Sequence, residues 1–314
     1  MQNSNAIARQ TPTNSPQQIA PGVGYMTTVF VNLYFVEAED NSWVLVDTGL
    51  PLQSWRVRAA AAEKLGPDAR PSAIILTHGH FDHAGNALAL ATEWDVPIYA
   101  HELEMPYLTG KSDYPPQDPT VGGALAQMSR LFPHSGYDFK NKVRALPADG
   151  SLPGLSGWRC LHTPGHTAGH ISLFRERDRV LITGDALTTV NQESPVTLLT
   201  LKRELRQPPA PLTTDWGAAR NSIDNLAGLR PSVIAAGHGL PITENAADRL
   251  ERFAQTFAPP AHGRYVHQPA RTDENGVVAL PPPVPDPVSK VIVGATLAAV
   301  AGLMIAQLRK RRRR

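Results

Sequence analysis

The chain has 314 residues, of which 42% are hydrophobic and 18% charged, a composition typical of a globular protein long enough to bury a core. Its single cysteine excludes an intrachain disulfide, which suits a reducing compartment. The last 25 residues hold seven of the 30 Lys and Arg residues and no acid, so the remainder is mildly acidic, which argues against a polyanion-binding surface across the main domain.

The first part of the chain alternates between strands and helices after a polar start. Residues 1–20 lack the apolar run of a secretory signal and are predicted to be disordered. β-Branched and aromatic residues predict strands over 25–36, 43–49, 73–77 and 96–100. Helical composition covers 54–66 and 85–94.

An insertion and a second series of strands and helices follow. The insertion, over about 104–142, contains a loop dense in Pro, Asp and Ser and a helix expected over 123–132. Further strands are predicted over 158–163, 171–176, 179–183 and 232–237, and further helices over 216–229 and 243–257. This interleaving, without an internal repeat, predicts one α/β or α+β layered domain over 21–257.

The C-terminal region differs from this domain in composition. Residues 258–289 contain eight prolines and predict an extended linker. Residues 291–308 carry no charge and are flanked by basic residues, so 290–314 is predicted to be a transmembrane helix with a basic tail. A soluble helix with a basic end is the alternative.

Two further expectations depend on that helix. Gly294, Ala298 and Gly302 would let two such helices approach closely, which suggests a homodimer. The basic flank favours a catalytic domain outside the cytoplasm, whereas the missing export signal favours one inside. We expect a single-pass C-terminal membrane anchor with the catalytic domain in the cytoplasm.

The stretch THGHFDHAG at 77–85 concentrates metal-binding side chains. His78, His80, Asp82 and His83 fall within six residues, directly after an apolar run. Extended backbone directs His78 and His80 the same way, and imidazole with carboxylate suits Zn²⁺ and similar metals. Two imidazoles and a carboxylate already make three ligands and His83 is a further one, a surplus that indicates two metal ions; a polar loop of hydrogen-bonded histidines is the alternative.

Three later segments place similar residues beside glycines at strand ends, where ligands commonly meet in sheet proteins. They are His166 in HTPGHTAGH, Asp185 in TGDAL and His238 in AAGHGLP. Each of these signals is weak when taken alone.

Together these motifs resemble the metallo-β-lactamase superfamily, whose pattern is HxHxDH followed by a His, an Asp and a His. The Asp47-Thr48-Gly49 turn is similar to another motif of that family. The resemblance covers about 25–245 and implies an αββα sandwich, in which two mixed β-sheets pack face to face with helices outside and metals at one edge. The stretch TPGHTAGH is similar to the glyoxalase II-like branch, although no glutathione-binding C-terminal domain is evident.

The resemblance also implies roles for individual residues. His78, His80 and His166 would hold one metal ion, Asp82, His83 and His238 a second, and Asp185 would bridge them. Asp47 would orient ligands without binding metal, and we expect His170 to have a structural hydrogen-bonding role.

Two divalent ions, most simply Zn²⁺ with Fe or Mn as alternatives, would share a hydroxide that acts as the nucleophile. Asp82 would orient it and pass a proton to the leaving group. The expected function is hydrolysis of an ester, thioester or lactone-type acyl bond in a small molecule, with no nucleic-acid partner. A mononuclear iron persulfide dioxygenase and a phosphodiesterase or nuclease are the alternatives.

The insertion has two interpretations. Its large side chains could cap the metal site and select the substrate, or they could belong to a peripheral helix that packs on the sandwich. Those side chains are Tyr107, Tyr114, Met128, Phe132 and Tyr137.

Overall fold

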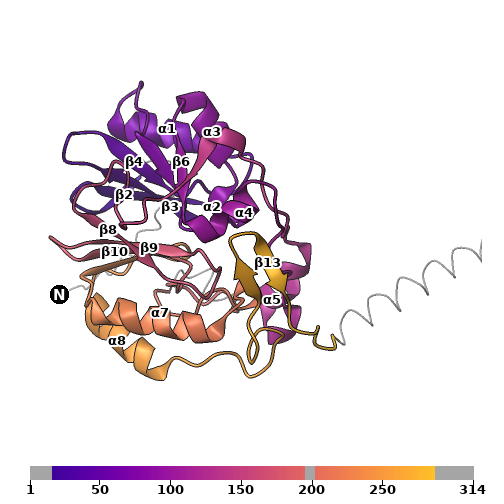
Figure 1. The fold of residues 1–314 in the computed structure, drawn as a ribbon. Helices are drawn as coiled ribbons and strands as arrows, with labels where there is room; N and C mark the ends of the chain where they lie inside the picture. Colours follow the sequence, from indigo (N-terminus) through magenta and orange to yellow (C-terminus); the bar gives the residue numbers. More distant parts are fainter. Residues whose placement is uncertain (1–15, 195–201, 287–314) are drawn as a thin grey trace, which may run out of the picture.

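The computed structural model describes residues 16–194 and 202–286, and in them two β-sheets pack face to face with helices outside (Figure 1). The first sheet has seven strands in chain order: β1 (Gln17–Ala20), β2 (Val23–Thr28), β3 (Val31–Glu37), β4 (Trp43–Val46), β5 (Ala73–Ile75), β6 (Ile98–Ala100) and β7 (Val143–Ala145). Strands β1 to β4 are antiparallel and β4 to β7 parallel, so this sheet is mixed.

The second sheet has four strands, in the order β11-β10-β9-β8. These strands are β8 (Trp158–His162), β9 (Ile171–Arg175), β10 (Val180–Gly184) and β11 (Val233–Ala236). β8, β9 and β10 are antiparallel, whereas β10 and β11 are parallel, so this sheet is mixed as well. A separate hairpin pairs β12 (Arg271–Asp273) with β13 (Gly276–Ala279).

The helices are α1 (Ser54–Leu65), α2 (Phe81–Ala84), α3 (Ala87–Trp94), α4 (Met105–Leu108), α5 (Ala124–Met128), α7 (Trp216–Gly228) and α8 (Ala246–Thr256). In Figure 1, α1 and α3 cover the outer face of the first sheet and α7 and α8 that of the second, whereas α2, α4 and α5 lie beside the sheets. Short 3₁₀ turns are η1 (Glu102–Glu104), η2 (Pro119–Val121), η3 (Ser129–Leu131), η4 (Lys140–Lys142) and η5 (Ala210–Leu212). Asp215 caps α7, because its side chain accepts the Ala218 N–H.

The alternation of side chains along β3 shows why the chain forms layers. Every residue from Val31 to Val36 is buried, and neighbours point to opposite faces of the sheet. Leu33 and Phe35 join the cluster beneath α1 and α3, whereas Tyr34 and Val36 join the cluster between the sheets. A third cluster packs the second sheet against α7 and α8. The predicted αββα sandwich is therefore the observed fold.

Two expectations about the ends of the domain are wrong. Gln17–Ala20 was expected to be disordered but pairs with β2 as an edge strand. The segment 258–289 was expected to be a linker, yet up to residue 286 it packs on the domain. The Tyr265 hydroxyl donates to the Pro116 carbonyl at 2.8 Å, and the Val277 N–H donates to Ser112 Oγ at 3.2 Å.

The predicted membrane anchor must also be corrected. Among the residues that the structure describes, no helix has both the length and the apolar character that a bilayer crossing requires. Residues 291–308, on which the expectation fell, lie outside the described part of the chain, as do the three small residues that suggested a homodimer. The transmembrane helix, the membrane partner and the anchored localisation are withdrawn.

Candidate metal centre

The seven predicted ligands lie together in the structure, and all are buried: His78, His80, Asp82, His83, His166, Asp185 and His238. His78 and His80 follow β5, and Asp82 and His83 belong to the single turn of α2. Asp185 and His238 follow β10 and β11, and His166 lies in the β8–β9 loop. Because parallel strands end at the same edge of a sheet, the topology brings these positions to one edge of the sandwich.

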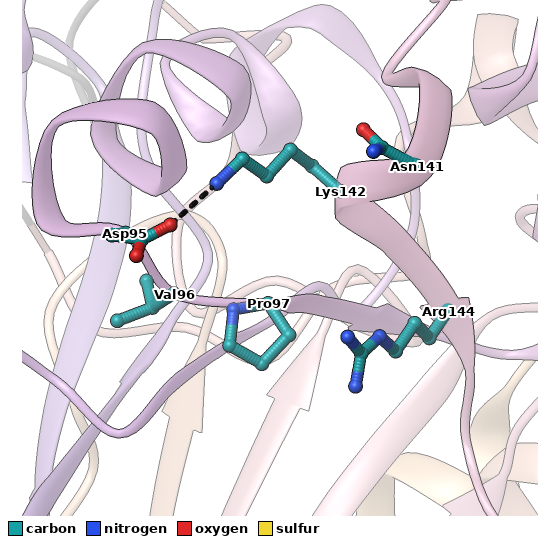
Figure 2. A pocket seen from close by; sticks show the side chains of 6 residues that line it. All are labelled: Asp95, Val96, Pro97, Asn141, Lys142 and Arg144. Carbon is teal, nitrogen blue, oxygen red and sulfur yellow. Dashed lines mark hydrogen bonds and ion pairs between the residues drawn. The ribbon is translucent and has the colours of Figure 1, made fainter.

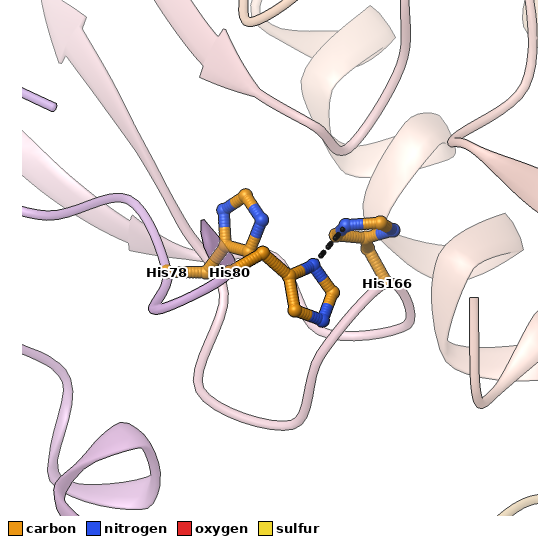
Figure 3. A group of neighbouring side chains, drawn as sticks. All are labelled: His78, His80 and His166. Carbon is orange, nitrogen blue, oxygen red and sulfur yellow. Dashed lines mark hydrogen bonds between the residues drawn. The ribbon is translucent and has the colours of Figure 1, made fainter. Parts of the chain in front are cut away.

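The ligand atoms form three overlapping groups, each with its atoms within 4.8 Å of one another. The groups are His78, His80 and His166; His78, His83 and Asp185; and Asp82, His83 and His238. Figure 3 shows the first group, in which His80 Nδ1 lies 2.9 Å from His166 Nε2. Such groups could hold metal ions.

Asp185 lies between the two predicted metal positions. Its Oδ2 is 3.6 Å from His166 Nε2 and 3.1 Å from His238 Nε2, and its Oδ1 is 3.5 Å from His83 Nε2. Asp82 Oδ2 also lies 3.4 Å from His238 Nε2. One carboxylate therefore contacts members of both predicted sets.

Four of the histidines have a hydrogen-bond partner at Nδ1. The partners are Thr77 Oγ1 for His78 at 3.1 Å, Asp47 Oδ2 for His83 at 2.8 Å, Thr213 Oγ1 for His166 at 3.3 Å and the Phe30 carbonyl for His238 at 2.9 Å. Thr77 donates its own hydroxyl proton to Asp47, and Thr213 donates to the Pro209 carbonyl, so both accept from the ring. A neutral ring that donates from Nδ1 has its lone pair on Nε2, the state that a metal ligand needs. In the described structure His238 Nε2 instead lies 3.1 Å from Asp185 Oδ2, which needs a proton on that nitrogen, and nearby carboxylates raise the pKa of both His83 and His238.

Three atoms at the centre fit a cation. His78 Nε2, His83 Nε2 and Asp185 Oδ1 are buried and have no hydrogen-bond partner in the described structure. A buried polar atom without a partner costs about 1–3 kcal/mol. Convergence of three such atoms on one point has a simple explanation if the point is a metal site.

The histidines of the centre differ in the direction in which their pKa values are shifted. Burial lowers the pKa of His80 to about 3, and burial together with neighbouring histidines holds the pKa of His78 and His166 well below the usual range. Burial also disfavours charge on His83, yet Asp185, Asp47 and Asp82 together raise its pKa well above the usual value. Three imidazoles are thus held neutral, as ligation requires.

Asp47 and His170 have the contacts of orienting residues. Asp47 accepts from His83 Nδ1 and from the backbone and hydroxyl of Thr77, each at 2.8 Å. It adopts φ +60°, an uncommon conformation for a residue with a side chain. His170 Nε2 accepts the Asp185 N–H at 2.9 Å, while its Nδ1 lies 3.1 Å from the Thr163 carbonyl.

Sequence reasoning missed Glu104, a fully buried carboxylate in the insertion. Its Oε2 accepts from the Gly79 N–H at 2.9 Å and the Tyr114 hydroxyl at 2.5 Å. Its Oε1 accepts from Thr167 Oγ1 at 2.6 Å and the Gly169 N–H at 3.0 Å. Glu104 thereby joins the HxH loop, which is the segment His78–His80, to the loop of His166. Its sequence context contains no metal-binding motif that would have revealed it.

Asn32 on β3 was also missed. Its side-chain amide donates to the carbonyls of Ala236 at 2.9 Å and Gly239 at 2.6 Å, on either side of His238. The buried amide therefore fixes the loop that carries His238 against the first sheet.

The space above the HxH loop is filled by the insertion. A Cβ added to Gly79 would lie 2.2 Å from the Tyr114 hydroxyl oxygen and 2.7 Å from Leu108 Cδ2. Only glycine fits between His78 and His80 while Tyr114 keeps its position.

A hollow of about 210 Å³ lies away from this centre (Figure 2). It is lined by Asp95, Val96, Pro97, Asn141, Lys142 and Arg144, with Lys142 Nζ 2.9 Å from Asp95 Oδ1. These residues flank the amino ends of β6 and β7, the opposite edge of the parallel strands from the candidate centre.

Comparisons with known proteins show what the chain is similar to in sequence and fold. The family described as Metallo-beta-lactamase superfamily matches residues 26–238. The probable metallo-hydrolase YflN of Bacillus subtilis is 47% identical over 229 residues, which cover 72% of this chain and 87% of YflN. Hydroxyacylglutathione hydrolase GloC of Haemophilus influenzae is 31% identical over 114 residues, 36% of this chain and 49% of GloC. A metallo-beta-lactamase family protein of Thermus thermophilus, TTHA1429, has a similar fold, with a TM-score of 0.51, 22% identity and coverage of 76% of this chain and 80% of its own.

Proposed function

The chain belongs to the metallo-beta-lactamase superfamily and is a metallo-hydrolase, and on this premise we propose that it uses two metal ions to cleave an ester, thioester or lactone-type acyl bond. The observation that carries the proposal is the position of Asp185. Its carboxylate contacts His166 on one side and His83 and His238 on the other, as a residue shared by two ions would.

The proposed ligand sets follow the groups of converging atoms. His78, His80 and His166 hold one ion, Asp82, His83 and His238 hold the other, and Asp185 is shared. Imidazole nitrogens with few carboxylates favour zinc over magnesium or calcium, so zinc is the proposed metal.

When bound, the ions supply a water of lowered pKa and polarise the substrate carbonyl. The residues of the chain supply position and proton handling. Asp82 is buried at the centre, 3.4 Å from His238, and burial raises the pKa of its carboxyl group. We propose that Asp82 orients the attacking water and passes a proton to the leaving group.

The test combines metal analysis with a substrate screen. Purified protein should contain about two zinc ions per chain and hydrolyse at least one substrate among thioesters, lactones, esters and β-lactams. The relative GloC, a hydroxyacylglutathione hydrolase, is the reason for including glutathione thioesters. One iron per chain with oxygen consumption, or cleavage of phosphodiesters alone, would overturn the proposal.

Replacement of single residues tests the ligand assignment. Asp185→Asn should lose metal and most activity, whereas His170→Asn should retain more of both, because His170 contacts only the backbone of Asp185. The exposed His262→Asn is the matched control for a lost imidazole. Equal losses in Asp185→Asn and His170→Asn would contradict the assignment.

A further inference from the structure

An apolar pocket of about 110 Å³ opens beside the candidate centre, where Asp82 and His238 form part of its lining. Its apolar walls are formed by Phe30, Leu125, Met128, Phe132, Pro209 and Leu212. Three of these side chains come from the insertion, and the ring of Phe30 stacks on that of His238 with centroids 5.9 Å apart. The insertion therefore contributes a wall beside the proposed reaction centre.

The opposite face of the centre is closed. Tyr114 lies against His80, with ring centroids 4.8 Å apart, and Tyr107 stacks on Tyr114 at 4.1 Å. The space left among these rings, His166 and Thr272 of the hairpin is about 10 Å³. That is close to the smallest volume that holds one water molecule. A substrate must therefore approach from the side of Asp82 and His238.

The charges of the pocket restrict what can enter it. None of the described residues that line it is cationic, and beyond the two predicted ligands its one polar side chain is Gln192. A carboxylate or phosphate on the substrate's chain would lose water there without gaining a counter-charge. Met128 and Phe30 are 56% and 40% exposed, so an apolar chain that covers them removes apolar surface from water, which favours binding.

We propose that this pocket binds a neutral alkyl chain, so that the substrate is an aliphatic ester, thioester or lactone without a charged group on that chain. The proposal rests on the proposed function for the bond that is cleaved. The chain lies along Leu125 and Met128 of α5, and its carbonyl end faces Asp82 and His238.

Binding of methyl ketones tests the pocket separately from catalysis. These neutral compounds, from butanone to decanone, present a carbonyl and an alkyl chain but no bond to hydrolyse. Calorimetry on the metal-loaded full chain should show affinity rising about three- to fourfold per methylene until the pocket is filled. Affinity that does not depend on chain length would overturn the proposal.

A pair of charge substitutions sharpens the test. Met128→Lys puts a cation at the pocket wall, whereas Leu131→Lys puts the same charge three residues away on a side chain that is 88% exposed and outside the lining. Met128→Lys should lose most of the gain in ketone affinity per added methylene, and it should bind a chain with a terminal carboxylate more tightly than the wild type does. Leu131→Lys should behave as the wild type. Identical behaviour of the two variants would overturn the proposal.

Hydrolysis of acyl series separates the two proposals. A hydrolysis rate that rises with the length of an uncharged acyl chain supports both the proposed function and the alkyl pocket. Hydrolysis with a preference for carboxylate-terminated acyl chains overturns the alkyl pocket alone. Chain-length-dependent ketone binding without hydrolysis of any acyl bond overturns the proposed function and leaves the pocket standing.

Discussion

Glu104 shows how one side chain can hold two ligand loops at a fixed separation. Hydrogen bonds to a charged group contribute about 1.5–3 kcal/mol each, and Glu104 accepts four: one backbone N–H from each ligand loop, and the hydroxyls of Thr167 and Tyr114. Its carboxylate can accept all four because it carries no proton donor of its own.

Replacement of this carboxylate should loosen the metal centre. In Glu104→Gln the amide nitrogen would face N–H or O–H donors and could not accept from them. We expect about 1–3 kcal/mol lower stability, with metal affinity falling by roughly ten- to a hundredfold. Elemental analysis after dialysis and a thermal melt measure the two effects.

The control for this prediction is Glu102→Gln, an exposed neighbour on the same 3₁₀ turn. It should leave both quantities near the wild-type values. A Glu104→Gln protein that melts earlier but keeps its metal would show that Glu104 supports the fold and not the centre.

Residues with a motif could be predicted from the sequence, and residues without one could not. The close spacing of metal-binding side chains made it possible to predict His78, His80, Asp82 and His83, and the structure places them beside the three later candidates. That they bind metal stays a prediction. Asn32 and Glu104 act through backbone groups of distant segments, 204 residues away for Asn32, so only the folded chain reveals them.

Among the elements, the turn η1 is capped by His101, the residue before it, and the titration of this histidine should affect stability. His101 accepts the Leu103 N–H at 3.2 Å and stacks on His162 with ring centroids 4.2 Å apart. Burial, with His162 as the second cause, lowers the pKa of His101 from 6.5 to about 4. Between these pH values the unfolded chain binds a proton that the folded chain does not, so stability falls as the pH drops through this window.

Replacement of His101 should reduce the dependence of folding stability on pH. His101→Asn keeps an acceptor for the Leu103 N–H but does not titrate. Urea midpoints at pH 7.5 and pH 5 should differ less in this variant than in the wild type and in the His262→Asn control. A variant with the full wild-type difference would show that other groups account for it.

The hairpin β12–β13 was missed because the prolines around it dominated the composition. The turn between its strands is Glu274-Asn275, and Gly276, the first residue of β13, adopts φ +104°, which glycine permits. Alternation in strands of three and four residues is too short to stand out beside PPPVPDP. Contacts with distant segments, such as the hydrogen bond from the Val277 N–H to Ser112 Oγ in the insertion, give the hairpin its place.

At the scale of the whole molecule, the candidate metal centre lies between the two sheets. Its proposed ligands come from the ends of β5 and α2 on one side and from β10, β11 and the β8–β9 loop on the other. A ligand that binds only the folded chain stabilises it by about 2.7 kcal/mol at a hundred times its Kd. Bound metal should therefore hold the layers together.

Metal removal should lower the melting temperature. Treatment with EDTA should reduce the Tm by roughly 5–10 °C, as expected for that free energy in a domain of this size. In Asp185→Asn the same treatment should have a smaller effect. An unchanged Tm after verified metal loss would contradict a centre that couples the sheets.

The layered fold could be predicted because strand and helix patterns interleave along most of the chain, whereas the arrangement of two mixed sheets packed face to face came from the family resemblance. The ends were harder. Local composition wrongly predicted disorder at Gln17–Ala20, because an edge strand gains its stability from its neighbour β2. The prediction of a membrane helix rested on the apolar composition of residues 291–308, which lie outside the described residues. Within the described residues, no helix is long and apolar enough to span a membrane.

The close approach of Tyr114 to Gly79 constrains how this protein can be redesigned. Trimming the insertion would strip the cover from the backbone between two ligands, and placing any larger residue at that position would displace the tyrosine. The HxH loop and the segment above it must therefore be exchanged as a matched pair. A library that varies only one of them should yield few active clones.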